Sequence, residues 1–231
     1  MKILFISDLH LGSPLFKSDD TIIKLLGDTS YDKVVIIGDL IDTWEGTTER
    51  VVRRNKNIIE KINELSNVII VKGNHDPSFE ALSEIFPNAD CVKHFEPYME
   101  DDILITHGDD FDKLVTDYSF FAKMVFPLQW LFSRLGMNPK AKIRNTLHSI
   151  ACHREKKYYN DLVTDVEEHL VDKYKDACKY LVAGHTHLPK LVNSGDIMYV
   201  NCGDWVHNRT YAEYIDGVFT IKKEDGNNYF E

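Results

Sequence analysis

Short, uninterrupted apolar runs recur along the chain, and a polar or glycine-containing loop directly follows each of them. Five such runs, rich in β-branched residues, are Lys2–Ser7, Lys33–Ile37, Val68–Val71, Ile103–Thr106 and Tyr180–Ala183. Continuous runs of this length are typical of strands that are buried on both faces. Helical patterns at Asp19–Leu26 and Thr48–Leu65 separate the first three runs. This alternation predicts a sheet with parallel strands and with polar residues at their carboxyl ends.

Two segments depart from this alternation. From Ile197 to Lys222, apolar and polar positions alternate around Asp216-Gly217, a dipeptide typical of hairpin turns. We expect antiparallel strands there that complete a second sheet. A mostly helical pattern also predicts an insertion at about 111–177 within a single domain of residues 1–231.

The composition is that of a globular protein. Hydrophobic residues make up 43% and charged residues 28% of the chain, which is ordinary for a folded domain. The four cysteines lie far apart without a CxxC pair, as expected for free thiols in a reducing compartment. The apolar N-terminal run is short and contains an aspartate, so it predicts a buried strand rather than a signal peptide. These features predict a cytoplasmic protein without a membrane-spanning segment.

Oxygen and imidazole donors follow the predicted strands at their carboxyl ends. The seven residues are Asp8, His10, Asp39, Asn74, His107, His185 and His187. Because ligands of such sheets bind outside the carboxyl ends of the strands, we expect these side chains to converge. Donors of this kind, without a thiolate, suit Mn, Fe, Zn or similar divalent ions. Glycines beside them, such as Gly38 and Gly73, predict turns with positive φ or a close approach of the backbone.

The donors fall into blocks that resemble the calcineurin-like metallophosphoesterase family. The blocks, in the family's order, are Asp8-x-His10, Gly38-Asp39-x-x-Asp42, Gly73-Asn74-His75-Asp76, His107-Gly108 and Gly184-His185-Thr186-His187. The resemblance implies an α/β fold, a four-layer α/β/β/α sandwich of two mixed sheets, in which the insertion forms a helical cap.

The resemblance also implies a role for each residue. One divalent ion would be held by Asp8, His10 and His187. A second ion would be held by Asn74, His107 and His185. Asp39 would bridge the two ions, which would share a hydroxide that attacks phosphorus in line. His75 would protonate the leaving oxygen and Asp42 would orient His75. We expect Mn²⁺, with Fe, Zn, Ni and Mg as alternatives.

Two further stretches resemble UDP-2,3-diacylglucosamine pyrophosphatases. Gly38–Gly46 is similar to their corresponding block, and Tyr199–Val206 resembles a late Gly-Asp-Trp block of their relatives. The chain departs from that group at His75, where the group has arginine. The main hypothesis is a phosphohydrolase that cleaves a phosphoester or pyrophosphate bond in a small nucleotide-linked or lipid-linked substrate. The alternatives are a phosphodiesterase or nuclease acting on cyclic nucleotides or nucleic acid ends, and a non-catalytic scaffold that retains the fold.

The predicted insertion differs in charge from the rest of the chain. Tyr118–Asn160 contains eight basic residues and one acidic residue, whereas the whole chain has a net charge of −10. The segment is also rich in aromatic residues. We expect the insertion to form a lid over the metals. The alternatives, in decreasing order of preference, are packing against the core, peripheral membrane contact through 118–160, and nucleic acid binding. The overall acidity disfavours extended DNA as a partner, and the sequence does not indicate an oligomeric state.

Two smaller pairs of residues near the blocks are also candidates for a role at the site. Trp44 and Trp205 either flank the pocket or pack in the core, and the sequence leaves both open. Asn201 and Asp204 lie a short distance after the Gly-His-x-His block, and we expect them to help position it.

Overall fold

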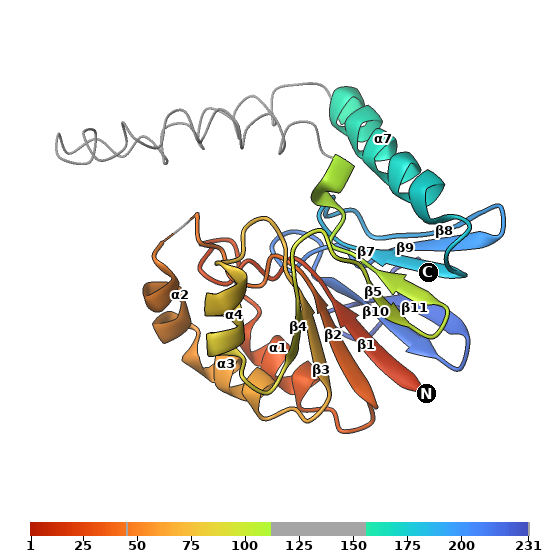
Figure 1. Ribbon diagram of the computed structural model, residues 1–231. Coiled ribbons are helices and arrows are strands. Elements are labelled where there is room, and N and C mark those ends of the chain that lie inside the picture. Colours follow the sequence, from red (N-terminus) through yellow and green to blue (C-terminus); the bar gives the residue numbers. More distant parts are fainter. Residues whose placement is uncertain (45, 112–155, 231) are drawn as a thin grey trace, which may run out of the picture. The chain divides into compact units, whose positions relative to one another are not determined.

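The computed structural model describes residues 1–44, 46–111 and 156–230 (Figure 1). The chain divides into two compact units, one formed by Met1–Gly108 with Lys173–Glu231 and the other by Asp109–Asp172. Most of the predicted insertion lies outside the described residues, and so does most of the basic, aromatic segment. The cap and the lid therefore stay predictions. In the described ranges no helix has the length and apolar character needed to cross a bilayer.

The first sheet has six strands among the described residues, in the order β11-β10-β1-β2-β3-β4. Their bounds are β1 Lys2–Ile6, β2 Lys33–Ile37, β3 Val68–Val71, β4 Asp90–Val92, β10 Thr210–Ile215 and β11 Val218–Lys223. Strands β1 to β4 run parallel, whereas β10 pairs antiparallel with β1 and β11 pairs antiparallel with β10. The sheet is therefore mixed, as predicted.

The second sheet has five strands within the described part of the chain, in the order β5-β6-β7-β9-β8. Their bounds are β5 Tyr98–Glu100, β6 Ile103–Ile105, β7 Tyr180–Ala183, β8 Lys190–Ser194 and β9 Ile197–Asn201. The central strands β6, β7 and β9 are parallel, and the two edge strands are antiparallel to their neighbours. This sheet is also mixed.

The prediction for the C-terminal strands was wrong in one respect. The hairpin at Asp216-Gly217 exists, and both residues have the positive φ that such a turn requires. The hairpin extends the first sheet, however, and only β9 joins the second. Pairing of β10 along β1 covers an edge of the parallel sheet that would otherwise be open to other strands. Ala212 and Phe219 of the hairpin then face the second sheet and contribute to the core between the sheets.

One predicted helix is divided into two in the structure. Helix α1 spans Asp19–Leu26, but the predicted helix at Thr48–Leu65 is divided into α2, Thr48–Arg54, and α3, Lys56–Asn63. At the break, the Asn55 side chain donates to the Val51 carbonyl and competes with the helical hydrogen bonds. Helix α4, Phe79–Ile85, was not predicted.

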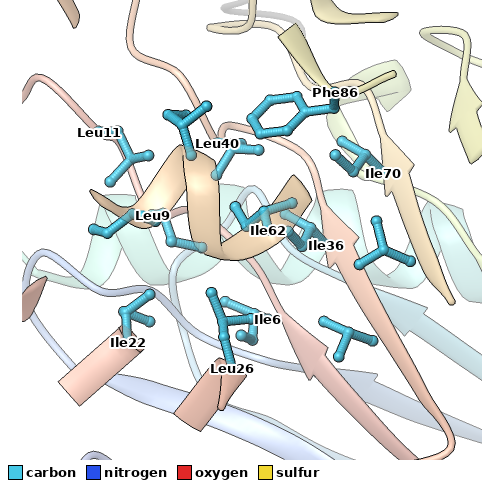
Figure 2. Close-up of a cluster of buried hydrophobic side chains, with 14 of the residues drawn as sticks. Ile6, Leu9, Leu11, Ile22, Leu26, Ile36, Leu40, Ile62, Ile70 and Phe86 are labelled. Carbon is cyan, nitrogen blue, oxygen red and sulfur yellow. The ribbon is translucent and has the colours of Figure 1, made fainter. Parts of the chain in front are cut away.

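Alternate residues of the first sheet face two separate cores. Leu4 and Ile6 of β1 pack with the helices, as Figure 2 shows for Ile6 beside Ile22 and Leu26. Ile3 and Phe5 instead join the core between the sheets. Burial of both faces explains why the strands read as continuous apolar runs. Each fully buried aliphatic side chain contributes about 1.5–3 kcal/mol, so the two cores hold the strand ends, and hence the loops, in place.

Candidate metal centre

The seven predicted donors lie in loops that begin where five strands end. Strands β1, β2 and β3 of the first sheet and β6 and β7 of the second sheet carry these loops. Backbone hydrogen bonds join neighbouring loops, from the Asp8 N–H to the Gly38 carbonyl and from the Gly184 N–H to the His107 carbonyl. Both sheets therefore contribute residues to one centre, as the strand-end pattern predicted.

An unusual backbone conformation is shared by most of the donors. Five of them have φ between 49° and 64°, namely Asp8, His10, Asp39, His185 and His187. In this region a residue with a Cβ costs about 1–3 kcal/mol, and such strain gathers at functional sites. The sequence predicted positive φ at glycines instead. Gly38 fits that prediction with φ of +72°.

The first group of donors brings together one carboxylate and two imidazoles. His187 Nε2 lies 3.2 Å from Asp8 Oδ1 and 3.3 Å from His10 Nε2. Asp8 Oδ1 is buried, and no donor in the described part of the chain reaches it with hydrogen-bond geometry. A buried oxygen without a donor is unfavourable, and a cation between it and the two ring nitrogens would satisfy all three atoms. These residues fit a divalent ion.

The second group is built around His107. Its Nδ1 donates to the Ile37 carbonyl at 3.0 Å, so in the neutral ring Nε2 carries the lone pair. That nitrogen faces two oxygens, Asn74 Oδ1 at 3.1 Å and Asp39 Oδ1 at 3.4 Å. Such a convergence of lone pairs also suits a cation. His185 reaches the centre through its backbone, whose N–H donates to Asp8 Oδ2 at 3.0 Å.

Asp39 lies between the two groups. Its Oδ2 is 3.7 Å from His10 Nε2, and its carboxylate forms a potential metal-binding group with Asp8 and His107. Its Oδ1 also accepts a hydrogen bond from the His75 N–H at 2.8 Å. The two carboxylate oxygens of Asp39 therefore face different groups, Oδ2 the first and Oδ1 the second.

Charges in the centre compensate one another. Burial alone would raise the pKa of Asp8 and of Asp39, but nearby imidazoles outweigh burial and lower both pKa values. Burial would lower the pKa of His187, but the carboxylates of Asp8 and Asp204 outweigh burial and raise it to about 10. In the metal-free protein the carboxylates are therefore ionised and an imidazole holds a proton, which a metal ion would displace.

The predicted acid and its partner lie beside the two groups. His75 Nδ1 is 3.2 Å from Asp42 Oδ1, and the other carboxylate oxygen of Asp42 is 3.3 Å from His10 Nδ1. Burial would raise the pKa of Asp42, but hydrogen bonds from His10 and His75 lower it well below its ordinary value. The contact between Asp42 and His10 was not predicted, since spacing along the chain does not reveal it.

Trp44 covers one face of His75. The two rings are stacked, with centroids 4.5 Å apart and planes 20° from parallel, and Trp44 remains 45% exposed. Trp205, in contrast, is fully buried in the helix-side core. Of the two tryptophans that the sequence left open, Trp44 flanks the centre and Trp205 packs in the core.

Asp76 is a residue to which the sequence analysis gave no role. Its Oδ1 accepts from the Ile41 N–H at 2.8 Å and its Oδ2 accepts from the Gly73 N–H at 2.9 Å. Burial and the neighbouring Asp39 raise the pKa of Asp76 to about 6. The carboxylate therefore ties the loop after β2 to the loop after β3.

An α/β sandwich with Asp and His donors at the strand ends defines the class of metal-dependent phosphohydrolases. Residues 1–189 match the model of the calcineurin-like phosphoesterase family, and the chain belongs to that family. It is therefore a hydrolase of phosphoester or phosphoanhydride bonds that binds divalent metal.

Relatives of known name cover most of the chain. The UDP-2,3-diacylglucosamine hydrolase of Aliivibrio fischeri is 28% identical, with 97% of this chain and 99% of that protein covered. The enzyme of the same name from Actinobacillus succinogenes is 31% identical, with 80% and 83% covered.

Solved structures support the fold. YfcE, a phosphoesterase from E. coli, has a TM-score of 0.56 at 18% identity, with 99% of this chain and 97% of that chain covered. Vps29 of Chaetomium thermophilum has a TM-score of 0.51 at 15% identity, with 99% and 93% covered. At these identities the likeness concerns the fold alone.

Proposed function

We propose that this chain uses two divalent ions to hydrolyse the pyrophosphate bond of a small, amphipathic, nucleotide-linked substrate of the UDP-diacylglucosamine kind. The observation that carries the proposal is the convergence of Asp8, His10, Asp39, His107 and His187 into overlapping metal-binding groups. The named relatives support the substrate class, because they match nearly the whole length of the chain.

The proposed ligands are those of the two groups described above together with His185, which the family resemblance adds and whose ring lies against that of His107, with centroids 5.3 Å apart. One ion is held by Asp8, His10 and His187. The other ion is held by Asn74, His107 and His185. Asp39 would hold both ions, which we propose to be Mn²⁺, one of the divalent ions that oxygen and imidazole nitrogen donors suit. When bound, such ions activate water and neutralise charge that develops on the phosphoryl oxygens.

His75 is proposed to donate a proton to the leaving oxygen. Burial lowers its pKa, but the carboxylates of Asp39 and Asp42 outweigh burial and raise it, so the imidazole retains its proton more readily than usual. Asp42 holds Nδ1 of His75 and thereby orients the other ring nitrogen towards the centre. General acids of this kind accelerate reactions by about 10²–10⁴-fold.

This acid favours a second candidate function. A phosphate leaving group departs readily as an anion, whereas an alcohol needs a proton in order to leave. The His75–Asp42 pair therefore suits a phosphodiester whose leaving group is an alkoxide. A phosphodiesterase that acts on cyclic nucleotides or nucleic acid ends is the alternative that this observation supports.

A substrate panel with purified protein and added Mn²⁺ tests both proposals. The panel contains UDP-2,3-diacylglucosamine, a cyclic nucleotide, single-stranded DNA and bis-p-nitrophenyl phosphate, with products followed by phosphorus NMR. Fastest cleavage of the UDP-lipid supports the first proposal, and fastest cleavage of a diester supports the second. Absence of turnover on every substrate refutes both and leaves the non-catalytic scaffold.

Two variants control the panel. Asp39→Asn should lose Mn²⁺ binding and turnover together, because the bridging carboxylate loses its charge. Asp28→Asn should retain both, because Asp28 is exposed and accepts the Ser30 N–H before β2, at the opposite end of the sheet from the centre.

A further inference from the structure

We infer that Asp204 is a positioning residue that holds His187 in the orientation and tautomer needed to bind metal. This inference rests on the proposed function, in which His187 is a metal ligand. Asp204 is completely buried, and its Oδ2 lies 2.8 Å from His187 Nδ1. Because an ionised carboxylate only accepts hydrogen bonds, His187 Nδ1 must be the donor.

The Asp204 carboxylate is itself held rigidly. Its other oxygen, Oδ1, accepts from the backbone N–H of His207 at 2.9 Å and from that of Asn208 at 2.7 Å. The Thr210 N–H donates to the Asp204 carbonyl at 3.0 Å. These bonds hold the turn between β9 and β10 and leave Oδ2 directed towards His187.

The same turn and the last residue of β9 also hold the backbone of the metal-binding loop, Gly184–His187. The Asn208 side chain donates to the His187 carbonyl at 2.6 Å. The Asn201 side chain donates to the Gly184 carbonyl at 2.7 Å and lies 3.0 Å from Thr186 Oγ1. Two asparagines therefore hold the loop backbone, and Asp204 holds the side chain that the loop presents.

The hydrogen bond decides which nitrogen of His187 is available to an ion. With the Nδ1 proton directed at Asp204, the lone pair of the neutral ring lies on Nε2. That nitrogen faces Asp8 Oδ1 at 3.2 Å and His10 Nε2 at 3.3 Å.

A structural role for Asp204 is the competing explanation, since Oδ1 alone would stabilise the turn. Two substitutions separate the roles. Asp204→Asn keeps an oxygen for the backbone N–H groups but presents N–H to His187 Nδ1, so the ring must carry its proton on Nε2, where the ion binds. Asp204→Ser also keeps an oxygen for the turn, but its side chain is too short to reach His187 and forces no tautomer.

The test is the Mn²⁺ affinity of each variant by equilibrium dialysis, with folding checked by circular dichroism and Asp28→Asn as the matched control. We expect Asp204→Asn to lower the affinity for one of the two ions by about 10–100-fold, the range found when a hydrogen-bond partner of a metal-binding histidine is removed. Asp204→Ser should lower this affinity less. In a His187→Ala background, either substitution should leave the remaining affinity unchanged.

Three outcomes overturn the inference. Wild-type affinity in Asp204→Asn or in Asp204→Ser would show that the hydrogen bond is not needed. Equal losses with and without His187 would show that Asp204 acts through the turn. In these two cases the proposed function stands, because the wild-type protein binds its ions. A wild-type protein that binds no Mn²⁺ would overturn the proposed function as well.

Discussion

Gly73→Ala places one methyl group inside the proposed metal centre. A Cβ at this position would lie 2.3 Å from Asp39 Oδ1, 2.5 Å from the Asp39 backbone nitrogen and 2.9 Å from His107 Nε2. Gly73 does not have a left-handed φ, so alanine can adopt its backbone conformation. The effect of the substitution is therefore steric.

The size of the clash sets the expected effect. Ordinary contacts of a Cβ begin at 3.4 Å, so the Asp39 carboxylate oxygen must move by about 1 Å. Overpacking of this kind destabilises a protein by about 1–3 kcal/mol. A misplacement of about 1 Å at a reacting centre lowers turnover by on the order of 10²-fold. Because Asp39 is the proposed bridge, the affinity for both ions should fall.

The matched control is Gly46→Ala. Its Cβ would meet only side-chain atoms of Arg50 and Val51 at 3.8 Å, which is ordinary contact. Three measurements compare the variants: Mn²⁺ affinity by dialysis, kcat/KM on bis-p-nitrophenyl phosphate, and urea unfolding of the metal-free protein. If Gly73→Ala equals Gly46→Ala in metal affinity and turnover, Asp39 does not hold the ions and the proposed centre is wrong.

Three further predictions concern the surroundings of the centre. His75→Ala should keep the affinity for Mn²⁺ but slow the hydrolysis of diesters with alkoxide leaving groups by about 10²–10⁴-fold, and that of p-nitrophenyl esters far less. Equal slowing of both reactions would contradict the role of His75 as an acid. Trp44→Ala should lower kcat/KM on the best substrate of the panel, because a stacked aromatic pair is worth about 0.5–1.5 kcal/mol, whereas Trp44→Phe should restore much of it. Glu100→Gln should destabilise the protein by about 0.5–1 kcal/mol near pH 7, because Glu100 Oε2 lies 2.5 Å from Lys33 Nζ across the two sheets. Burial raises the pKa of Glu100, but hydrogen bonds from Lys33 and Tyr98 lower it below its ordinary value of 4.5. Its contribution is thus present above 4.5 and lost as pH falls through the lower native pKa, and urea unfolding at neutral and acidic pH should show the difference between wild type and variant disappear in acid.

The sequence was sufficient to predict the buried strands and the polar residues at their carboxyl ends. Strands β1, β2, β3, β6 and β7 are buried on both faces, so they appear as continuous apolar runs, and the donors follow each of them. The buried parallel strands and the position of the donors at their ends could therefore be predicted, whereas the two mixed sheets followed from the family resemblance.

Features that depend on contacts across long separations could not be predicted. The hairpin of β10 and β11 carries an ordinary turn signal, and no local pattern indicates that β1 rather than the second sheet is its partner. The stacking of Trp44 on His75 and the contact between Asp42 and His10 join segments that only the folded sheet brings together. The left-handed backbone at five donors could not be predicted either, because Asp and His adopt this conformation more often than most residues but still only occasionally.

The charges of the centre explain how these donors can be buried together in the absence of metal. Asp8 and Asp39 are both buried and ionised, and two such carboxylates would repel each other strongly in a dry interior. Imidazoles supply the positive charge that offsets this repulsion, chiefly His187 for Asp8 and His107 for Asp39. Divalent ions supply the same charge when they bind, and the imidazole protons then leave. Protons and metal ions are therefore alternative partners of one set of carboxylates, which is why the fold can hold the ligands close together before any ion arrives.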